Sequence, residues 1–219
     1  MNDGPTALGK GAAKGANDRA LPPVRAVASG TASSKWAGLV RAIERCRACP
    51  LHAHRHHTVV YRGAVRPKVV FVGEAPGVEE DATGRPFVGR AGRRLDEAIG
   101  RLPLSREEFG ILNLIKCRPP GNRFDRRAEA ACRPFLDRQL ALLAPRLLVP
   151  LGAHALHALA PDAPAVTQAA GRWVGTSGTQ IFPLLHPAAA LHAAKYRERW
   201  TRDVAALGRA VAQIFGESL

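Results

Sequence analysis

The segment between Gly73 and Gly92 carries the residue types best suited to chemistry. It contains five glycines, two prolines and a phenylalanine, directly after the apolar run 69–72. Glycine and proline shape loops in which backbone N–H groups can approach a ligand closely. Four acids lie within the same segment: Glu74, Glu79, Glu80 and Asp81. The formal net charge of the chain is +14. Because an acidic cluster repels phosphate, we expect these acids to do something other than grip a nucleic-acid backbone.

Two further polar side chains follow apolar runs of the same kind. Asn113 lies in the stretch L-N-L-I-K-C-R-P-P-G-N-R, and His186 lies in L-L-H-P-A-A-A-L-H. An amide offers a hydrogen-bond donor and an acceptor side by side, and an imidazole can donate a hydrogen bond near neutral pH. Taken singly, each is more often a residue that fixes a loop.

The cysteines form a second candidate site, with the pattern C-x2-C, 67 residues, then C-x14-C: Cys46, Cys49, Cys117 and Cys132. In a cytoplasmic chain, four cysteines favour metal or cluster ligation over disulfides. Four thiolates suit a structural zinc ion or an iron–sulfur cluster, and the spacing alone does not choose between them.

Four short apolar runs that are typical of buried parallel strands must position these residues. The runs are 68–73, 110–115, 146–151 and 180–185. Prolines in the last two runs predict bulges or strand ends there. Helical patterns alternate with the runs. The first ends before Cys46, and the second includes Leu95, Ile99 and Leu102. The third extends from a cap at Asp125 to about Leu143, and the fourth spans 202–215.

This alternation predicts a three-layer α/β/α fold with a central four-stranded, mostly parallel sheet. Ligands of such sheets bind at the carboxyl ends of the strands. The loop after Gly73, Asn113 and His186 all fall on that edge. Their convergence favours a functional site over three unrelated structural residues.

Taken together, the glycine-rich acidic segment, the stretches around Asn113 and His186 and the four cysteines resemble the motifs of the family 4 uracil-DNA glycosylases, the thermostable-type enzymes that carry an iron–sulfur cluster. The resemblance covers the chain from about Trp36 onward. It implies a uracil-DNA glycosylase-like fold, hydrolysis of the bond between uracil and deoxyribose in DNA, and a structural [4Fe–4S] cluster on the four cysteines. By motif position it implies these site residues: Glu74, Ala75, Glu80, Phe87, Asn113 and His186.

The reaction produces a cationic sugar and an anionic base after the base has been flipped into a pocket. We expect Asn113 to pair with the O4 and N3–H edge of uracil and Phe87 to stack on the ring. His186 is expected to donate to O2, where negative charge accumulates.

Backbone N–H groups around Glu74 and Ala75 are expected to close the pocket. Either Glu74 or Glu80 can hold the attacking water or steady the cationic sugar. We prefer Glu80 for the water and leave the role of Glu74 open.

Basic residues flanking the site predict the contact with DNA: Arg85, Arg90, Arg93, Lys116, Arg118 and Arg123. Such residues give a salt-dependent affinity that does not depend on base sequence. Leu191 is the predicted wedge that fills the gap left by the flipped base, with Ala190 as the alternative.

The 219 residues suit one domain with a tail. Residues 1–34 are rich in small residues and lysine, which predicts a disordered basic tail before a glycosylase-like domain at 35–219. Lys plus Arg outnumber Asp plus Glu by 32 to 18, which indicates a polyanionic partner, with nucleic acid ahead of an anionic membrane surface. No apolar stretch approaches the roughly 20 residues of a membrane span. We expect a cytoplasmic monomer.

Two histidine groups remain outside the proposed site. His52, His54, His56 and His57 are expected on an exposed loop, and His154 and His157 are expected to pack within a helix. Two other functions stay open. The chain can be a non-catalytic nucleic-acid-binding module that bears a cluster, or a related glycosylase with altered base specificity.

Overall fold

Five strands form one sheet in the order β1-β3-β2-β4-β5. The computed structural model describes residues 31–175 and 179–216. The strands are β1 (Arg62–Gly63), β2 (Val69–Gly73), β3 (Phe109–Asn113), β4 (Leu147–Pro150) and β5 (Gln180–Ile181). β2 pairs in parallel with both β3 and β4, and β4 pairs in parallel with β5. The four expected strands are therefore present, and all four run parallel.

The fifth strand, β1, was not foreseen. It pairs antiparallel with β3 through Arg62 and Gly63 only, and two residues are too few to show a hydrophobic period. The proline prediction also holds. β4 ends at Pro150 and β5 ends before Pro183, because a proline has no N–H to donate to the ladder.

Helices flank the sheet on both sides. The α-helices are α1 (Thr31–Glu44), α2 (Val78–Thr83), α3 (Arg90–Ile99), α4 (Arg126–Leu143), α5 (Ala153–Leu159), α6 (Val166–Ala169), α7 (Ala189–His192) and α8 (Ala194–Phe215). Three short 3-10 turns are η1 (Pro50–Ala53), η2 (Arg106–Glu108) and η3 (Pro120–Asn122). Asp125 caps α4 as expected, because its side chain accepts hydrogen bonds from the backbone N–H groups of Arg127 and Ala128.

Two helix boundaries differ from the sequence prediction. α8 begins at Ala194, about two turns before the predicted start at 202. α1 begins at Thr31, inside the segment predicted to be a disordered tail. The rest of that segment, residues 1–30, lies outside the described residues.

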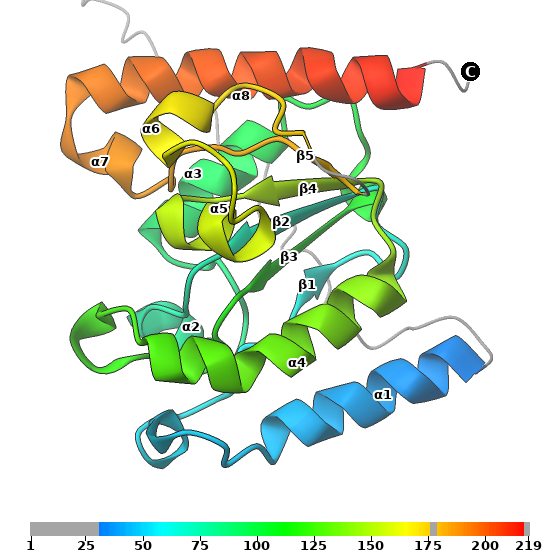
Figure 1. Cartoon of the computed structure of the whole chain (residues 1–219), viewed down its shortest axis with the longest axis vertical. Coiled ribbons are helices and arrows are strands. Elements are labelled where there is room, and N and C mark those ends of the chain that lie inside the picture. Colours follow the sequence, from blue (N-terminus) through cyan, green and yellow to red (C-terminus); the bar gives the residue numbers. More distant parts are fainter. Residues whose placement is uncertain (1–30, 176–178, 217–219) are drawn as a thin grey trace, which may run out of the picture.

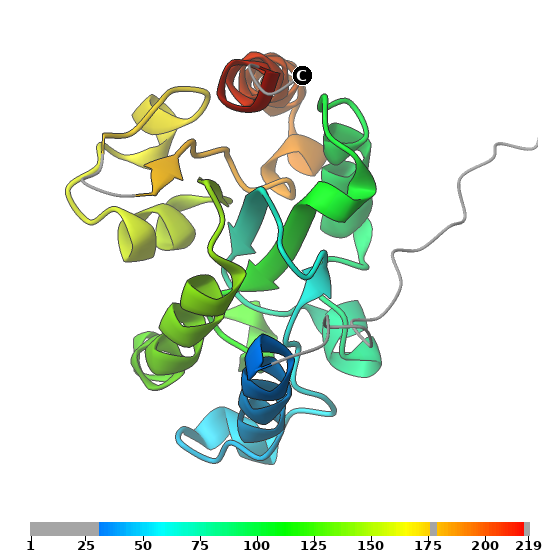
Figure 2. The same ribbon diagram turned by 90° about the vertical axis from the view of Figure 1, so that its right-hand side faces the viewer.

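Alternate residues of β2 divide the core into two halves, one on each face of the sheet between the flanking helices (Figure 1). Val69 and Phe71 belong to the half that is covered by α3 and α8. Val70 and Val72 belong to the half that is covered by α1, α4 and α5. Figure 2 shows the same arrangement from the side, with α8 and α1 at opposite ends of the molecule. The sheet is thus the middle layer of three, as the alternation of strands and helices predicts.

The strand register brings the ends of the central strands together. Gly73, the last residue of β2, pairs with Asn113, the last residue of β3, and Val72 pairs with Pro150. A bridge between Leu151 and Leu184 extends the contact of the last two strands toward His186. The loops that carry the expected site residues therefore leave the sheet at one edge.

Candidate active site

A cavity of about 330 Å³ opens at this edge. Its lining comes from five separate stretches of the chain: Glu74, Ala75, Pro76, Gly77, Glu80, Phe87, Ala91, Asn113, Pro119, Asn122, His186 and Ala188. All six residues expected to bind the base are among them. The cavity is of the size of a pocket for a small molecule.

Asn113 brings an unpaired acceptor to the cavity. The residue is 1% exposed, and its Oδ1 has no hydrogen-bond partner among the described residues. Glycine at position 73 makes room for this amide, because a Cβ there would lie 2.4 Å from Asn113 Oδ1 and 2.5 Å from the Phe87 ring. A buried polar atom without a partner is costly. Because Asn113 lines the cavity, a molecule bound there can supply the missing donor.

Phe87 lies beside Asn113 in an unusual backbone conformation. Its φ of 55° is in the left-handed region, which is strained for a bulky residue. Its ring is buried and lies 5.9 Å from the His186 ring, centroid to centroid. Gly92 packs against its backbone so closely that a Cβ at position 92 would lie 2.0 Å from the Phe87 carbonyl oxygen. The surrounding loop therefore holds the ring in place.

The Glu80 carboxylate supplies much of that restraint. Its Oε1 accepts hydrogen bonds from the backbone N–H groups of Val88 and Gly89, both at 2.9 Å. Its Oε2 accepts one from Gly77 at 3.0 Å. Three backbone donors thus converge on one carboxylate, which ties α2 to the loop that carries Phe87. Most of its capacity to bind a water molecule is used in this way.

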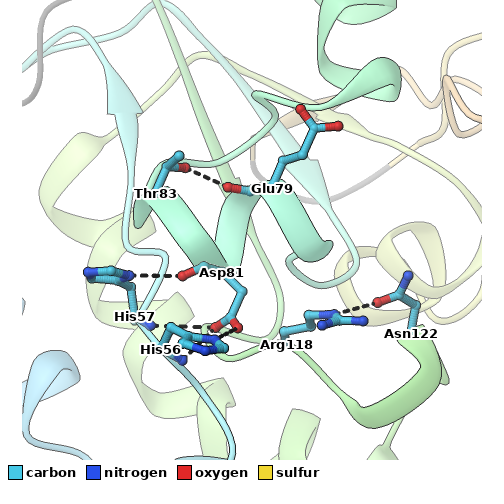
Figure 3. A network of polar contacts seen from close by, with 7 residues as sticks. All are labelled: His56, His57, Glu79, Asp81, Thr83, Arg118 and Asn122. Atoms are coloured by element: carbon cyan, nitrogen blue, oxygen red, sulfur yellow. Dashed lines mark hydrogen bonds and ion pairs between the residues drawn. The ribbon is translucent and has the colours of Figure 1, made fainter.

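Asp81, the next residue of α2, faces the loop that carries His56 and His57 (Figure 3). Its carboxylate accepts a hydrogen bond from the backbone N–H of His56 at 3.0 Å and lies 2.8 Å from His56 Nδ1. His57 Nδ1 lies 2.9 Å from the Asp81 carbonyl oxygen. Burial acts to raise the pKa of Asp81, but the hydrogen bonds from His56 and His57 prevail and lower it. The four loop histidines are exposed, as expected, and two of them anchor the loop to α2.

His186 is set up to donate a hydrogen bond. Its Nδ1 accepts one from the backbone N–H of Ala188 at 3.2 Å, so the neutral ring carries its proton on Nε2. Burial lowers the pKa of His186 to about 4, with Glu80 opposing the shift. Near neutral pH the ring is therefore an uncharged donor at the cavity wall.

Glu74 is a half-buried carboxylate in the same lining. Burial raises its pKa, His154 lowers it and Glu129 raises it further. His154 Nε2 lies 3.9 Å from Glu74 Oε2. His154 and His157 lie on α5, as expected, but the prediction that they are packed there is wrong, because the His154 side chain is 44% exposed and His157 is exposed. The imidazole stacks on Phe124, with 3.7 Å between the ring centroids and 16° between the planes.

The residues expected to contact DNA do not all reach the surface. Arg90 and Arg123 are exposed, and Arg85 and Arg118 are half-buried. Arg118 Nε donates to Asn122 Oδ1 at 2.9 Å (Figure 3).

The prediction that Lys116 contacts DNA is wrong, because the residue is 1% exposed and its Nζ donates to the Asn113 carbonyl oxygen. Burial lowers its pKa to about 7. Lys116 therefore does not belong to a DNA-binding surface.

The expected wedge lies on α7, close to the cavity residue Ala188. Leu191 is half-buried there, whereas Ala190 is 2% exposed. Burial removes Ala190 as an alternative, because a buried methyl group cannot enter a gap in DNA.

The cysteines surround a second, much smaller cavity. All four line it, together with Arg55 and Lys116. Arg55 Nη1 donates to Cys117 Sγ at 3.2 Å, and the Ala48 N–H donates to Cys46 Sγ at 3.4 Å. Burial raises the pKa of Cys132 to about 11 and also raises that of Cys117. Among the residues that the structure describes, no group of three or more His, Cys, Asp or Glu side chains is arranged to hold a metal ion.

Six residues that line the cavity were not predicted from the sequence as base-binding residues: Pro76, Gly77, Ala91, Pro119, Asn122 and Ala188. The best available signal was the run P-P-G-N. Gly121 and Asn122 both have positive φ, which glycine and asparagine tolerate best. The two alanines carry no chemical signal, and only the fold places them at the cavity.

Comparison with known proteins decides the family. The sequence model described as "Uracil DNA glycosylase superfamily" matches residues 60–207. The chain belongs to this superfamily. The match spans the sheet and the whole cavity, so the three-layer arrangement is the fold of a uracil DNA glycosylase superfamily member.

Relatives within the superfamily are similar over most of the chain. The type-4 uracil-DNA glycosylase of Thermotoga maritima is 43% identical over 150 residues, which cover 66% of this chain and 77% of that protein. The type-4 enzyme of Pyrobaculum aerophilum is 39% identical over 172 residues, or 74% and 88% of the two chains. That of Sulfurisphaera tokodaii is 38% identical over 168 residues, or 72% and 76%. These similarities confirm the resemblance inferred from the motifs.

In the described residues, no helix is long and apolar enough to cross a membrane.

Proposed function

We propose that this superfamily member removes uracil from DNA by hydrolysing its N-glycosidic bond and leaves an abasic site. One observation carries the proposal. The unpartnered Asn113 Oδ1, the Phe87 ring and the neutral His186 lie in one cavity. A pyrimidine with an N–H beside a carbonyl satisfies the Asn113 amide on both sides, whereas cytosine presents no such edge.

The cleavage step moves an electron pair from the bond to the sugar onto the uracil ring. The Nε2–H of His186 donates to O2, where this charge gathers, and Phe87 holds the ring by stacking. The sugar is left electron-poor, and a water molecule adds its oxygen to the sugar carbon while a base accepts the proton. A low pKa suits His186 to this task, because the ring stays neutral near pH 7 and donates a hydrogen bond to O2 without taking up a further proton.

Glu74 is the better candidate for handling the water. Glu80, which the sequence analysis preferred, accepts three backbone hydrogen bonds, and its removal would collapse the loop. Glu74 shares the cavity, its carboxylate accepts no hydrogen bond from the described residues, and His154 Nε2 lies 3.9 Å from its Oε2. We therefore assign the water to Glu74 and the positioning of Phe87 to Glu80.

The test uses oligonucleotides that contain one uracil, thymine or cytosine at the same position. After incubation with the purified chain, alkali cleaves the strand at any abasic site. Cleavage of the uracil strand alone supports the proposal. Intact uracil strands favour the non-catalytic binding module, and cleavage of another strand favours altered specificity.

Asn113→Ala should reduce the single-turnover rate at least about 100-fold while DNA affinity changes little. Gln139 offers a matched control, because it is also a buried amide whose side-chain oxygen has no partner among the described residues, and it lies outside the cavity. Gln139→Ala should lower stability and leave turnover intact. Equal losses of turnover in the two variants would mean that Asn113 only supports the fold.

We propose that the four cysteines hold a [4Fe–4S] cluster with a structural role. The donor set fits, because all four thiols line one small cavity beside Arg55, whose positive charge offsets thiolates. Burial raises the pKa values of Cys117 and Cys132 and so favours their neutral thiols, and a bound cluster would favour the thiolates instead. The cluster would tie the segment after α1 to the chain that follows Asn113.

Iron and sulfide analysis and visible absorbance of the anaerobically purified protein test this assignment. Broad visible absorbance that bleaches on loss of iron supports the cluster. A colourless protein with one bound zinc ion per chain contradicts it. Activity is a separate readout, since hydrolysis of the glycosidic bond needs no redox step.

The DNA surface, the oligomeric state and the location follow as further proposals. Exposed arginines near the cavity, such as Arg90 and Arg123, contact phosphates, and Leu191 fills the space of the flipped base. We also propose that the protein acts as a cytoplasmic monomer. Light scattering on the purified chain, with and without a uracil oligonucleotide, measures the oligomeric state.

A further inference from the structure

A stacked pair of rings stands beside the carboxylate of Glu74. His154 and Phe124 lie face to face, 3.7 Å apart and 16° from parallel. The two residues come from different elements. His154 is in the first turn of α5, and Phe124 immediately precedes the cap of α4. Stacking on Phe124 restricts the imidazole to one plane, so its Nε2 stays on the side of Glu74 Oε2, 3.9 Å away.

The backbone before α5 fixes this position further. Gly152 joins β4 to α5 with a φ of 92°, and a Cβ there would lie 3.2 Å from the His186 Cβ. The start of α5 is therefore packed against the segment that carries His186. A histidine at position 154 is held near the cavity by both the turn and the stack, although its outer face is exposed.

The charges around Glu74 oppose one another. His154 on α5 favours the carboxylate, and Glu129 on α4 disfavours it. Glu80 on α2 and His186 also line the cavity, but the first is held by backbone N–H groups and the second is neutral. Partial burial disfavours the charged form of Glu74 as well. Of the groups named here, His154 alone can supply a positive charge to this carboxylate.

We propose that His154, held against Phe124, is a positioning residue that keeps the Glu74 carboxylate ionised and oriented for the glycosidic cleavage. The inference rests on the proposed function, in which Glu74 handles the water. A protonated Glu74 cannot accept a proton from water or stabilise a cationic sugar. The approach of DNA phosphates and the exclusion of water both make ionisation of Glu74 harder, so a positive charge at position 154 matters most when substrate is bound.

The test is the pH dependence of the single-turnover rate of uracil release at constant ionic strength. Activity should rise with pH as Glu74 loses its proton. His154→Gln removes the cation, so this rise should move to higher pH, with a loss of about two- to fivefold on the acid side and convergence with the wild type at higher pH. His154→Lys should restore most of the acid-side activity, because it returns the positive charge without the stack on Phe124. Phe124→Leu should give an intermediate profile, because the ring is no longer fixed.

His157→Gln is the matched control, since His157 is exposed on the same helix and should leave the profile unchanged. A wild-type chain that releases no uracil overturns the proposed function and this inference together. An active wild type whose profile coincides with those of His154→Gln and His154→Lys overturns this inference alone. A loss in His154→Gln that is equal at every pH, or that lysine does not rescue, also overturns it, because it indicates a purely structural role.

Discussion

Replacing Glu80 by glutamine separates a loop-holding role from a catalytic one. The carboxylate accepts hydrogen bonds from the backbone N–H groups of Gly77, Val88 and Gly89. Glutamine keeps one oxygen, which can serve two of these donors, and turns an NH2 group toward the third. A hydrogen bond to a charged acceptor contributes about 1.5–3 kcal/mol and a neutral one about 0.5–1.5 kcal/mol. Weakening two bonds by about 1–1.5 kcal/mol each and losing a third of about 1.5–3 kcal/mol gives about 3.5–6 kcal/mol. Because Glu80 is only half-buried, we expect a smaller cost of about 2–4 kcal/mol.

A loss of this size leaves most domains folded, since their free energy of unfolding is about 5–15 kcal/mol. Activity should fall more steeply, at least about tenfold, because the strained backbone of Phe87 relaxes and the ring leaves the cavity. Urea unfolding measures the first effect and single-turnover uracil release measures the second. Glu74→Gln is the comparison. It should lower the rate without lowering stability, because burial already disfavours the charged form of Glu74.

The result that refutes this reasoning is a Glu80→Gln protein as stable as the wild type but without activity. Such a protein would return the water-holding role to Glu80. Normal turnover in Glu74→Gln would mean that Glu74 does not handle the water.

Three further predictions concern the loop and its pH dependence. Gly73→Ala should lower turnover at least about tenfold in single-turnover assays with little change in gel-shift affinity, because its Cβ would displace the Asn113 amide and the Phe87 ring. Asp81→Asn should lower the free energy of unfolding in urea by about 1–3 kcal/mol, since it weakens the anchor between α2 and the histidine loop; unchanged stability would make that anchor incidental. The lowered pKa of His186, about 4, means that the unfolded chain binds this proton more readily. Stability should therefore fall as the pH drops from about 6.5 toward 4, and urea unfolding of His186→Asn across this range should show a weaker dependence.

Much of the fold was predictable because the relevant patterns are local. The apolar runs around Val70, Leu112 and Leu148 indicate strands that are buried on both faces, and their alternation with helices allows few topologies. Short elements were harder to predict. β1 has two residues, and α2 has six residues of which three are acidic, so neither shows a period that distinguishes it from a loop.

The roles of individual charged residues were less predictable. Lys116 lies in a basic stretch, yet the chain turns inward after β3 and buries it beside the cysteine cavity. His154 was expected to be packed within a helix. It does lie on α5, but its side chain is exposed beside Glu74 because α5 begins at the edge of the cavity. Glu79, Glu80 and Asp81 are consecutive acids of similar appearance. Whether each faces solvent, the Phe87 loop or the histidine loop depends on how α2 docks.

The sequence by itself determined the family, the order of strands and helices and the set of residues that gather at one edge of the sheet. These features depend on residue type and spacing, which the chain carries whatever its conformation. Only the tertiary structure decided which carboxylate is free to act and which is bound by backbone N–H groups, and which cations reach the surface. The reason is physical: hydrogen-bond partners and burial are properties of groups brought together from distant parts of the chain, and they set the charge state and freedom of each side chain.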